Sequence, residues 1–82
     1  MSVRIAEDAV ILEGRCLVED AETLLVALKE HTGLPVDVSG VERLHMAVVQ
    51  ILFVLRPDLR GTVRDPFLAR QLFWSTGFRA TN

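Results

Sequence analysis

Hydrophobic residues recur along the chain with two different spacings, and the spacing predicts which segments are strands and which are helices. Two β-prone runs at 3–6 and 9–12 flank the acidic pair Glu7-Asp8, and they predict a hairpin or two adjacent strands. Residues 35–39 alternate apolar and polar side chains and predict a third strand, which Ser39-Gly40 ends. Residues 59–64 predict a fourth strand, which Gly61 weakens.

Two segments carry clear helix signals. In the first, apolar residues at 21, 24, 25 and 28 lie on one helical face, and Asp20 is the expected N-cap because its carboxylate can accept a first-turn N–H. Gly33 supplies the left-handed conformation that closes such a helix. The last helix is predicted to begin at Asp65-Pro66, a capping residue followed by proline at the first helical position, and to end at Gly77.

The apolar segment 46–55 is ambiguous by periodicity alone. It is rich in β-branched residues, but it is long for a strand and shows no alternation. Its length is about half of what a helix needs to cross a bilayer, so we expect no membrane insertion. Strands separated by helices predict a largely parallel sheet with crossover helices.

Composition narrows the function classes. The 82 residues are expected to form one domain spanning 1–82, and the hydrophobic content of 50% is enough for a packed core. A net charge of −2 argues against nucleic-acid binding. The single Cys16 cannot form an internal disulfide, and the first ten residues lack the apolar run of a secretory signal, so we expect a cytoplasmic protein.

Catalytic and ligand-binding motifs find no support in the sequence. Cys16 has no histidine close by in the sequence, and we expect it to pack as a small hydrophobic residue. The acidic pairs Glu7-Asp8 and Glu19-Asp20 flank predicted element ends and are expected to be turns and caps. There is no glycine-rich phosphate loop and no Cys/His cluster with metal spacing, so we expect no enzyme, no cofactor and no metal.

The order of elements, together with two motifs, resembles the STAS domain of bacterial anti-sigma factor antagonists. Residues 36–50, VDVSGVERLHMAVVQ, are similar to that family's strand and the helix that follows it, and residues 12–17, LEGRCL, are similar to its L-x-G-x-L strand. The resemblance covers nearly the whole chain. It implies that 46–55 is a helix, and that the fold is an α/β sandwich with a small mixed four-stranded sheet and three helices in the order β-β-α-β-α-β-α.

The departures from the STAS pattern concern its regulatory site. Phosphorylatable members carry Ser or Thr at the start of the second helix, where this chain has Met46 and Ala47. His45 stands at the family's Asp position and Val48 at its usual Gly. Neither a thioether nor a methyl group can carry a phosphate ester, so a kinase-driven switch at this helix start is chemically unavailable. The link at 56–59 is also short for the family, which leaves the register of the last strand open.

The second helix is the expected interaction surface. Its sequence offers only Gln50 as a polar residue, whereas a surface helix normally carries polar residues opposite its buried stripe. Either a neighbouring helix or the tail with Trp74 and Phe78 covers the extra apolar face, or the face binds a partner. STAS domains meet partners around this helix start, so the predicted partner-binding residues are Leu44, His45, Met46, Ala47, Val49, Gln50 and Phe53. Four arginines, Arg43, Arg56, Arg60 and Arg64, are a candidate rim, although a solvated face explains them more simply. At His45, a capping or surface role is the simpler explanation, and pH-dependent docking is the alternative.

These observations predict a non-catalytic protein–protein interaction module in bacterial signalling. By resemblance, the expected partner is an anti-sigma kinase-like protein, a chemosensory component or further STAS copies, which leaves a homo-oligomer open. One alternative is an accessory subunit bound to the ATPase of a lipid-transport ABC system. Another is a STAS module that binds a small ligand.

Overall fold

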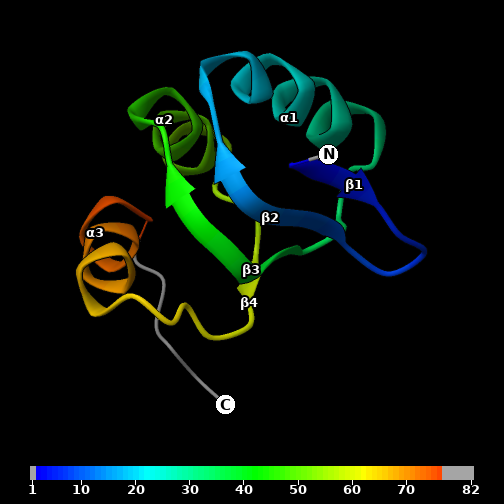
Figure 1. The fold of residues 1–82 in the computed structure, drawn as a ribbon. Coiled ribbons are helices and arrows are strands. Elements are labelled where there is room, and N and C mark those ends of the chain that lie inside the picture. Colours follow the sequence, from blue (N-terminus) through cyan, green and yellow to red (C-terminus); the bar gives the residue numbers. More distant parts are fainter. Residues whose placement is uncertain (1, 77–82) are drawn as a thin grey trace.

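A computed structural model describes residues 2–76, with side chains described except at 71 and 73–76. Seven elements follow one another in this part of the chain in the order β-β-α-β-α-β-α, which confirms the predicted order (Figure 1). They are β1 (Val3–Ile5), β2 (Val10–Cys16), α1 (Val18–Glu30), β3 (Val36–Leu44), α2 (Met46–Leu55), β4 (Leu59–Arg60) and α3 (Pro66–Thr76).

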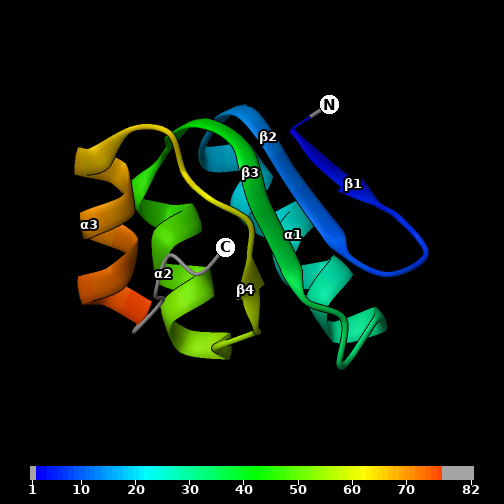
Figure 2. The ribbon, with the colours of Figure 1, turned by 90° about the horizontal axis from the view of Figure 1, so that it is seen from below.

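The four strands form one mixed sheet in the order β1-β2-β3-β4. β1 and β2 are an antiparallel hairpin, whereas β2, β3 and β4 are parallel and are connected by α1 and α2. Both connecting helices lie on the same face of the sheet, and α3 lies beside α2 (Figure 2). The predicted α/β architecture with a small mixed sheet is therefore confirmed, and α2 is the middle helix of its layer, between α1 and α3.

Alternation along the two central strands builds the core. The helices fully bury Val10 and Leu12 of β2 and Val36 and Val38 of β3. Leu24 of α1 is fully buried in the same core. The alternate residues point to the opposite face, where Ile11 is half-buried and Glu13, Asp37 and Ser39 are polar and reach solvent. The helix layer therefore covers one side of the sheet.

The two central strands are longer than the sequence predicts. Ser39-Gly40 does not end β3, because pairing with β2 continues through Glu13↔Gly40 to Cys16↔Leu44. Gly40 allows close approach there, since a Cβ on it would lie 3.2 Å from Cβ of Glu13. In contrast β4 is only two residues long, and Gly61 ends it with φ +97°. The prediction that Ser39-Gly40 ends the strand is therefore wrong, because the neighbouring strand keeps the segment at Gly40 extended.

The helix starts show one wrong prediction and one confirmed prediction. Asp20 is not the N-cap of α1, because the helix begins earlier and Leu17 occupies the cap position. The Asp20 carboxylate instead accepts the backbone N–H of Leu17 at 2.6 Å, reaching back from the first turn. Asp65 does cap α3, since its Oδ1 accepts the N–H of Phe67 at 2.9 Å. Gly33 has the expected positive φ of +96°, while Gly77 lies outside the described residues.

Candidate functional site on the central helix

The start of α2 is fixed by the ends of the two paired strands. Cys16 pairs with Leu44 at the last register position, and the N–H of His45 donates to the carbonyl of Cys16 at 2.8 Å. His45 is the N-cap residue of α2, and its Nδ1 accepts the N–H of Ala47 at 3.0 Å. This geometry requires an unprotonated Nδ1, so the imidazole caps the helix as the sequence predicted for a neutral ring.

The two sides of α2 are both apolar, but they have different surroundings. Val48 and Leu52 are fully buried and face the sheet core. On the outward side, Met46 is 53% exposed, Phe53 45% and Val54 71%. None of the ten residues of α2 is charged, so solvent meets a nearly continuous apolar strip rather than the usual polar stripe. We call the exposed Met46, Gln50, Phe53 and Val54 the outward strip.

The structure places the seven predicted partner-binding residues in three different environments. His45, Met46, Gln50 and Phe53 are exposed, and the last three share the outward strip. Leu44 and Ala47 are half-buried and pack against the core. Val49 is only 1% exposed, so it is a packing residue of the monomer and offers no surface to a partner.

Other exposed apolar residues, which were not predicted as binding residues, lie near this helix. Val54 is more exposed than Phe53, and its position one residue further along the same helix was the available signal. Leu17 and Val18 follow β2 directly where it pairs with the end of β3, and they are 51% and 54% exposed. The sequence contains no signal of this exposure, because Leu17 continues the helical spacing of positions 21, 24 and 28 toward the N-terminus.

The arginines proposed as a rim do not all lie at the outward strip, as Arg56 and Arg60 show. The guanidinium carbon of Arg56 lies 5.1 Å from the centroid of the Phe53 ring, a cation–π distance. Arg60 instead lies on β4 and pairs with Asp8 at 3.2 Å and Asp37 at 3.5 Å. Arg56 therefore borders the strip at its far end, whereas Arg60 belongs to a polar cluster on the open face of the sheet.

That polar cluster joins three segments of the chain. Asp37 accepts hydrogen bonds from the Ser39 side chain and from the Ser39 backbone N–H at 2.9 Å, in addition to its contact with Arg60. Partial burial raises the pKa of Asp37, but the hydrogen bonds from Ser39 and Arg60 outweigh that effect and lower the pKa overall. Asp8, from the β1–β2 turn, completes the cluster through Arg60. The cluster ties the hairpin turn to β4 across the sheet.

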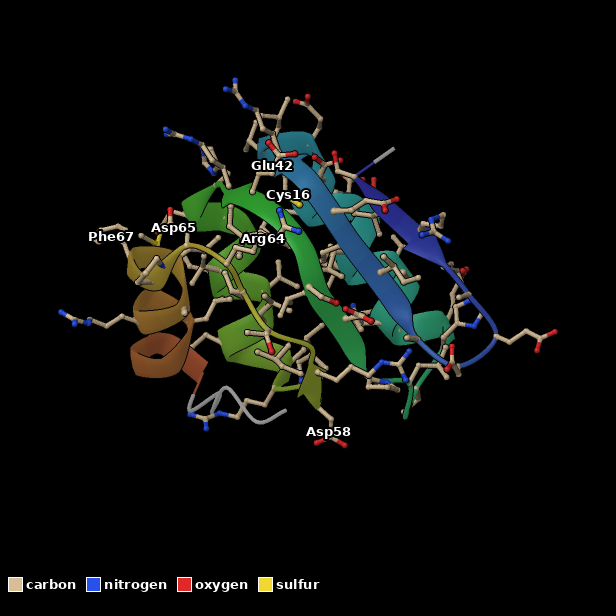
Figure 3. All side chains as sticks on the ribbon, turned by 60° about the horizontal axis from the view of Figure 1, so that its bottom comes forward. Cys16, Glu42, Asp58, Arg64, Asp65 and Phe67 are labelled. Carbon is tan, nitrogen blue, oxygen red and sulfur yellow. The ribbon has the colours of Figure 1, made fainter. Side chains whose placement is uncertain are left out.

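Cys16 lies in the core, where it has no access to a substrate. It is 1% exposed, and burial raises the pKa of its thiol to about 11, with the nearby Asp20 carboxylate adding to the shift. A thiol with so high a pKa stays protonated and is a poor nucleophile at neutral pH. Figure 3 shows Cys16 by β2, away from Asp65 and Phe67 at the start of α3.

Two negative findings apply to the described part of the chain. Within residues 2–76, no group of three or more His, Cys, Asp or Glu side chains is arranged to hold a metal ion. None of the helices described there has the length and apolar character needed to span a bilayer.

Comparison with known proteins adds no relative. No protein family, no curated protein and no solved structure matches the chain. The STAS resemblance therefore rests on the motifs at 12–17 and 36–50 and on the order of elements.

Proposed function

We propose that this chain is a non-catalytic protein-binding module, and that the outward strip of α2 is its main docking surface. The observation that carries the proposal is the exposure of Met46, Phe53 and Val54 on a helix that has no charged residue. Exposed apolar patches of this kind tend to mark sites where another protein binds. Methionine and phenylalanine also suit an interface, because they add apolar area and methionine adapts its shape.

The same surface supports recognition by apolar contact rather than by phosphorylation. Met46 and Ala47 occupy the positions where the STAS resemblance places a phosphorylatable hydroxyl, and the cap of α2 is a histidine nitrogen. Affinity would then come from apolar contact, mostly through the few side chains that the partner covers completely, rather than in proportion to the buried area. Partner concentration or partner state, and not a phosphate on this helix, would control binding.

The partner classes follow from the STAS resemblance and belong to this proposal. A signalling partner, such as an anti-sigma kinase-like protein or a chemosensory component, would bind reversibly. An ATPase of a lipid-transport ABC system would instead hold the chain as a permanent subunit, and copurification at fixed stoichiometry through high salt would favour it. The products of the neighbouring genes indicate which of these partner classes should be expressed and tested first.

A matched pair of phenylalanine variants tests the docking surface. Phe53 is 45% exposed on the outward strip, while Phe67 is 75% exposed at the start of α3 and points away from the body of the protein (Figure 3). Each is changed to Gln, and the affinity for partners encoded by neighbouring genes is measured by calorimetry with both variants checked for an unchanged melting temperature. We expect Phe53→Gln to weaken binding at least about tenfold, which is about 1.4 kcal/mol, and Phe67→Gln to leave it unchanged.

Two results would contradict this assignment. Equal loss of affinity in both variants would mean that the strip has no special part in recognition. Unchanged affinity in Phe53→Gln and in a Met46→Gln/Phe53→Gln double variant would place the docking surface elsewhere on the molecule.

A further inference from the structure

A groove lies between strand β1 and helix α1, away from the outward strip of α2. Its floor is apolar and is formed by Val3 and Ile5 of β1 and by Val26 and Ala27 of α1. Ile5 and Val26 are each 48% exposed, so water reaches this floor. The groove has a volume of ≈ 590 Å³, which is room for a few side chains of a partner.

The groove runs along an open edge of the sheet. β1 is the first strand in the sheet order, and within residues 2–76 β2 is the one strand that pairs with it. The N–H of Glu13 donates to the carbonyl of Ser2 and the N–H of Ala6 donates to the carbonyl of Ala9, both at 2.9 Å. Because hydrogen-bonded pairs alternate in an antiparallel ladder, Ser2 and Ala6 direct their backbone groups to β2, while Val3 and Ile5 direct theirs to the open edge. An extended segment can pair with those outward groups.

The rim of the groove is acidic. Glu19, Glu22 and Glu30 line it from the α1 side. In the described part of the chain, the ion pairs join Arg4 to Glu13 and Arg60 to Asp8 and Asp37, so the three glutamates have no cationic side-chain partner there. Their uncompensated charge favours a basic partner and disfavours an acidic one.

We infer that the β1 edge binds an extended, basic segment of a partner protein, which adds to the sheet as a fifth strand beside α1. Its backbone would pair with Val3 and Ile5, and the side chains on its helix-facing side would enter the groove. Apolar side chains there would contact Ile5 and Val26, and the stems of lysine or arginine would cover the same floor while their charged ends reach Glu22 and Glu30. A second copy of this chain fits less well, because pairing of two β1 edges would bring two acidic α1 faces toward one seam.

Synthetic peptides test this inference on the full chain. The first has Thr at every odd position and alternates Val with Lys at the even positions, and the second replaces each Lys with Glu. A third keeps the Lys sequence but carries N-methyl groups on the amides along both of its edges, so that it cannot donate in a ladder. Binding is followed by NMR titration and by hydrogen exchange of the Val3 and Ile5 amides.

We expect the Lys peptide to bind and to slow exchange of the Val3 and Ile5 amides, and the Glu and N-methyl peptides not to bind. The Glu22→Lys/Glu30→Lys variant should lose affinity for the Lys peptide at least about tenfold, while the matched control Glu42→Lys, on β3, should keep it. Phe53→Gln should also keep it, which separates this edge from the α2 proposal.

Three outcomes would overturn the inference. The first is absence of binding by the Lys peptide at millimolar concentration. The second is equal binding by the N-methyl peptide, which would show that backbone pairing is not involved. The third is a dimer in sedimentation experiments that the Glu22→Lys/Glu30→Lys variant strengthens and that excludes the Lys peptide, which would show that a second copy occupies this edge.

Discussion

The imidazole of His45 accepts the backbone N–H of Ala47 through Nδ1 at 3.0 Å, so this side chain satisfies one of the free donors at the start of α2. The same helix carries the outward strip, and its first residue, Met46, belongs to that strip. Any change at His45 therefore acts on the stability of the helix start that carries the first residue of the outward strip.

Replacing the cap tests this relationship. We expect His45→Ala to lower the free energy of unfolding by about 1 kcal/mol, because the N–H of Ala47 loses its acceptor. His45→Asp should restore the cap and gain from the helix dipole, which favours negative charge at this end. Urea unfolding of the three proteins at pH 7 checks the order. A His45→Ala protein as stable as wild type would show that the cap contributes nothing.

Two glycines with nearly the same φ form a matched pair. Gly61 has φ +97° and Gly33 has φ +96°, so alanine at either position incurs backbone strain of about 1–3 kcal/mol. A Cβ on Gly61 would also lie 2.7 Å from Oγ of Ser39 and 2.9 Å from Oδ1 of Asp37, whereas nothing lies within 4 Å at Gly33. We expect Gly61→Ala to be less stable than Gly33→Ala by at least about 1 kcal/mol in thermal unfolding. Equal losses would mean that the polar cluster moves aside at no cost.

The lowered pKa of Asp37 predicts a dependence of stability on acid. Because the folded state holds the carboxylate more strongly in its charged form than the unfolded chain does, its contribution is present above pH of about 4 and is lost as the pH falls through the folded pKa. Asp37→Asn should therefore lower stability at pH 7, and the difference from wild type should shrink as the pH falls below the ordinary aspartate pKa of about 3.9. Denaturant unfolding across this range measures it. A constant difference would exclude the charge of Asp37 as the cause.

Cys16 gives the complementary prediction at alkaline pH. Its folded pKa of about 11 lies above the value of 9.0 for an unperturbed thiol, so folding favours the neutral thiol. That contribution is complete below pH of about 9 and is lost as the pH rises toward the folded pKa.

We also expect iodoacetamide to modify Cys16 slowly in native protein at pH 8 and rapidly in denaturant. Rapid modification of the native protein would show that the core opens at this strand end.

Two valines on α2 distinguish a residue that packs in the core from a residue that is proposed to contact a partner. Val49 is 1% exposed and Val54 is 71% exposed. We expect Val49→Ala to cost about 2 kcal/mol of stability through lost burial and a cavity, and Val54→Ala to change stability by less than about 0.5 kcal/mol. Partner affinity should respond in the opposite order, with Val54→Ala weakening it. If Val49→Ala kept its stability but lost partner binding, Val49 would have to be counted among the residues that contact the partner.

The sequence predicted most of the elements because their signals are local. Asp65 followed by proline marks the start of α3 through a contact two residues away, and the apolar face of α1 repeats at helical spacing within one segment. The order of elements then predicted a largely parallel sheet, since strands joined through helices become parallel, and the parallel pairing of β2, β3 and β4 agrees with it. Segment 46–55 needed the STAS resemblance, because a helix that is apolar on all sides has no periodicity to detect.

The lengths of the strands and the exposure of the outward strip could be learned only from the tertiary structure. Gly40 continues β3 because β2 lies beside it, and a local turn signal contains no information about a neighbouring strand. Val49 and Phe53 are both apolar residues of one helix, yet only the packing of α2 between α1 and α3 buries the first and exposes the second.

What the sequence determined by itself is therefore the set of helices and strands, and the absence of a hydroxyl at Met46 and Ala47. Which apolar side chains meet water, which glutamates line the β1 edge and which arginine pairs with Asp37 were decided by the tertiary structure. The physical reason is that capping and periodicity act within a few residues along the chain, whereas burial and ion pairing depend on segments that folding brings together, as Arg60 and Asp8 show across the sheet.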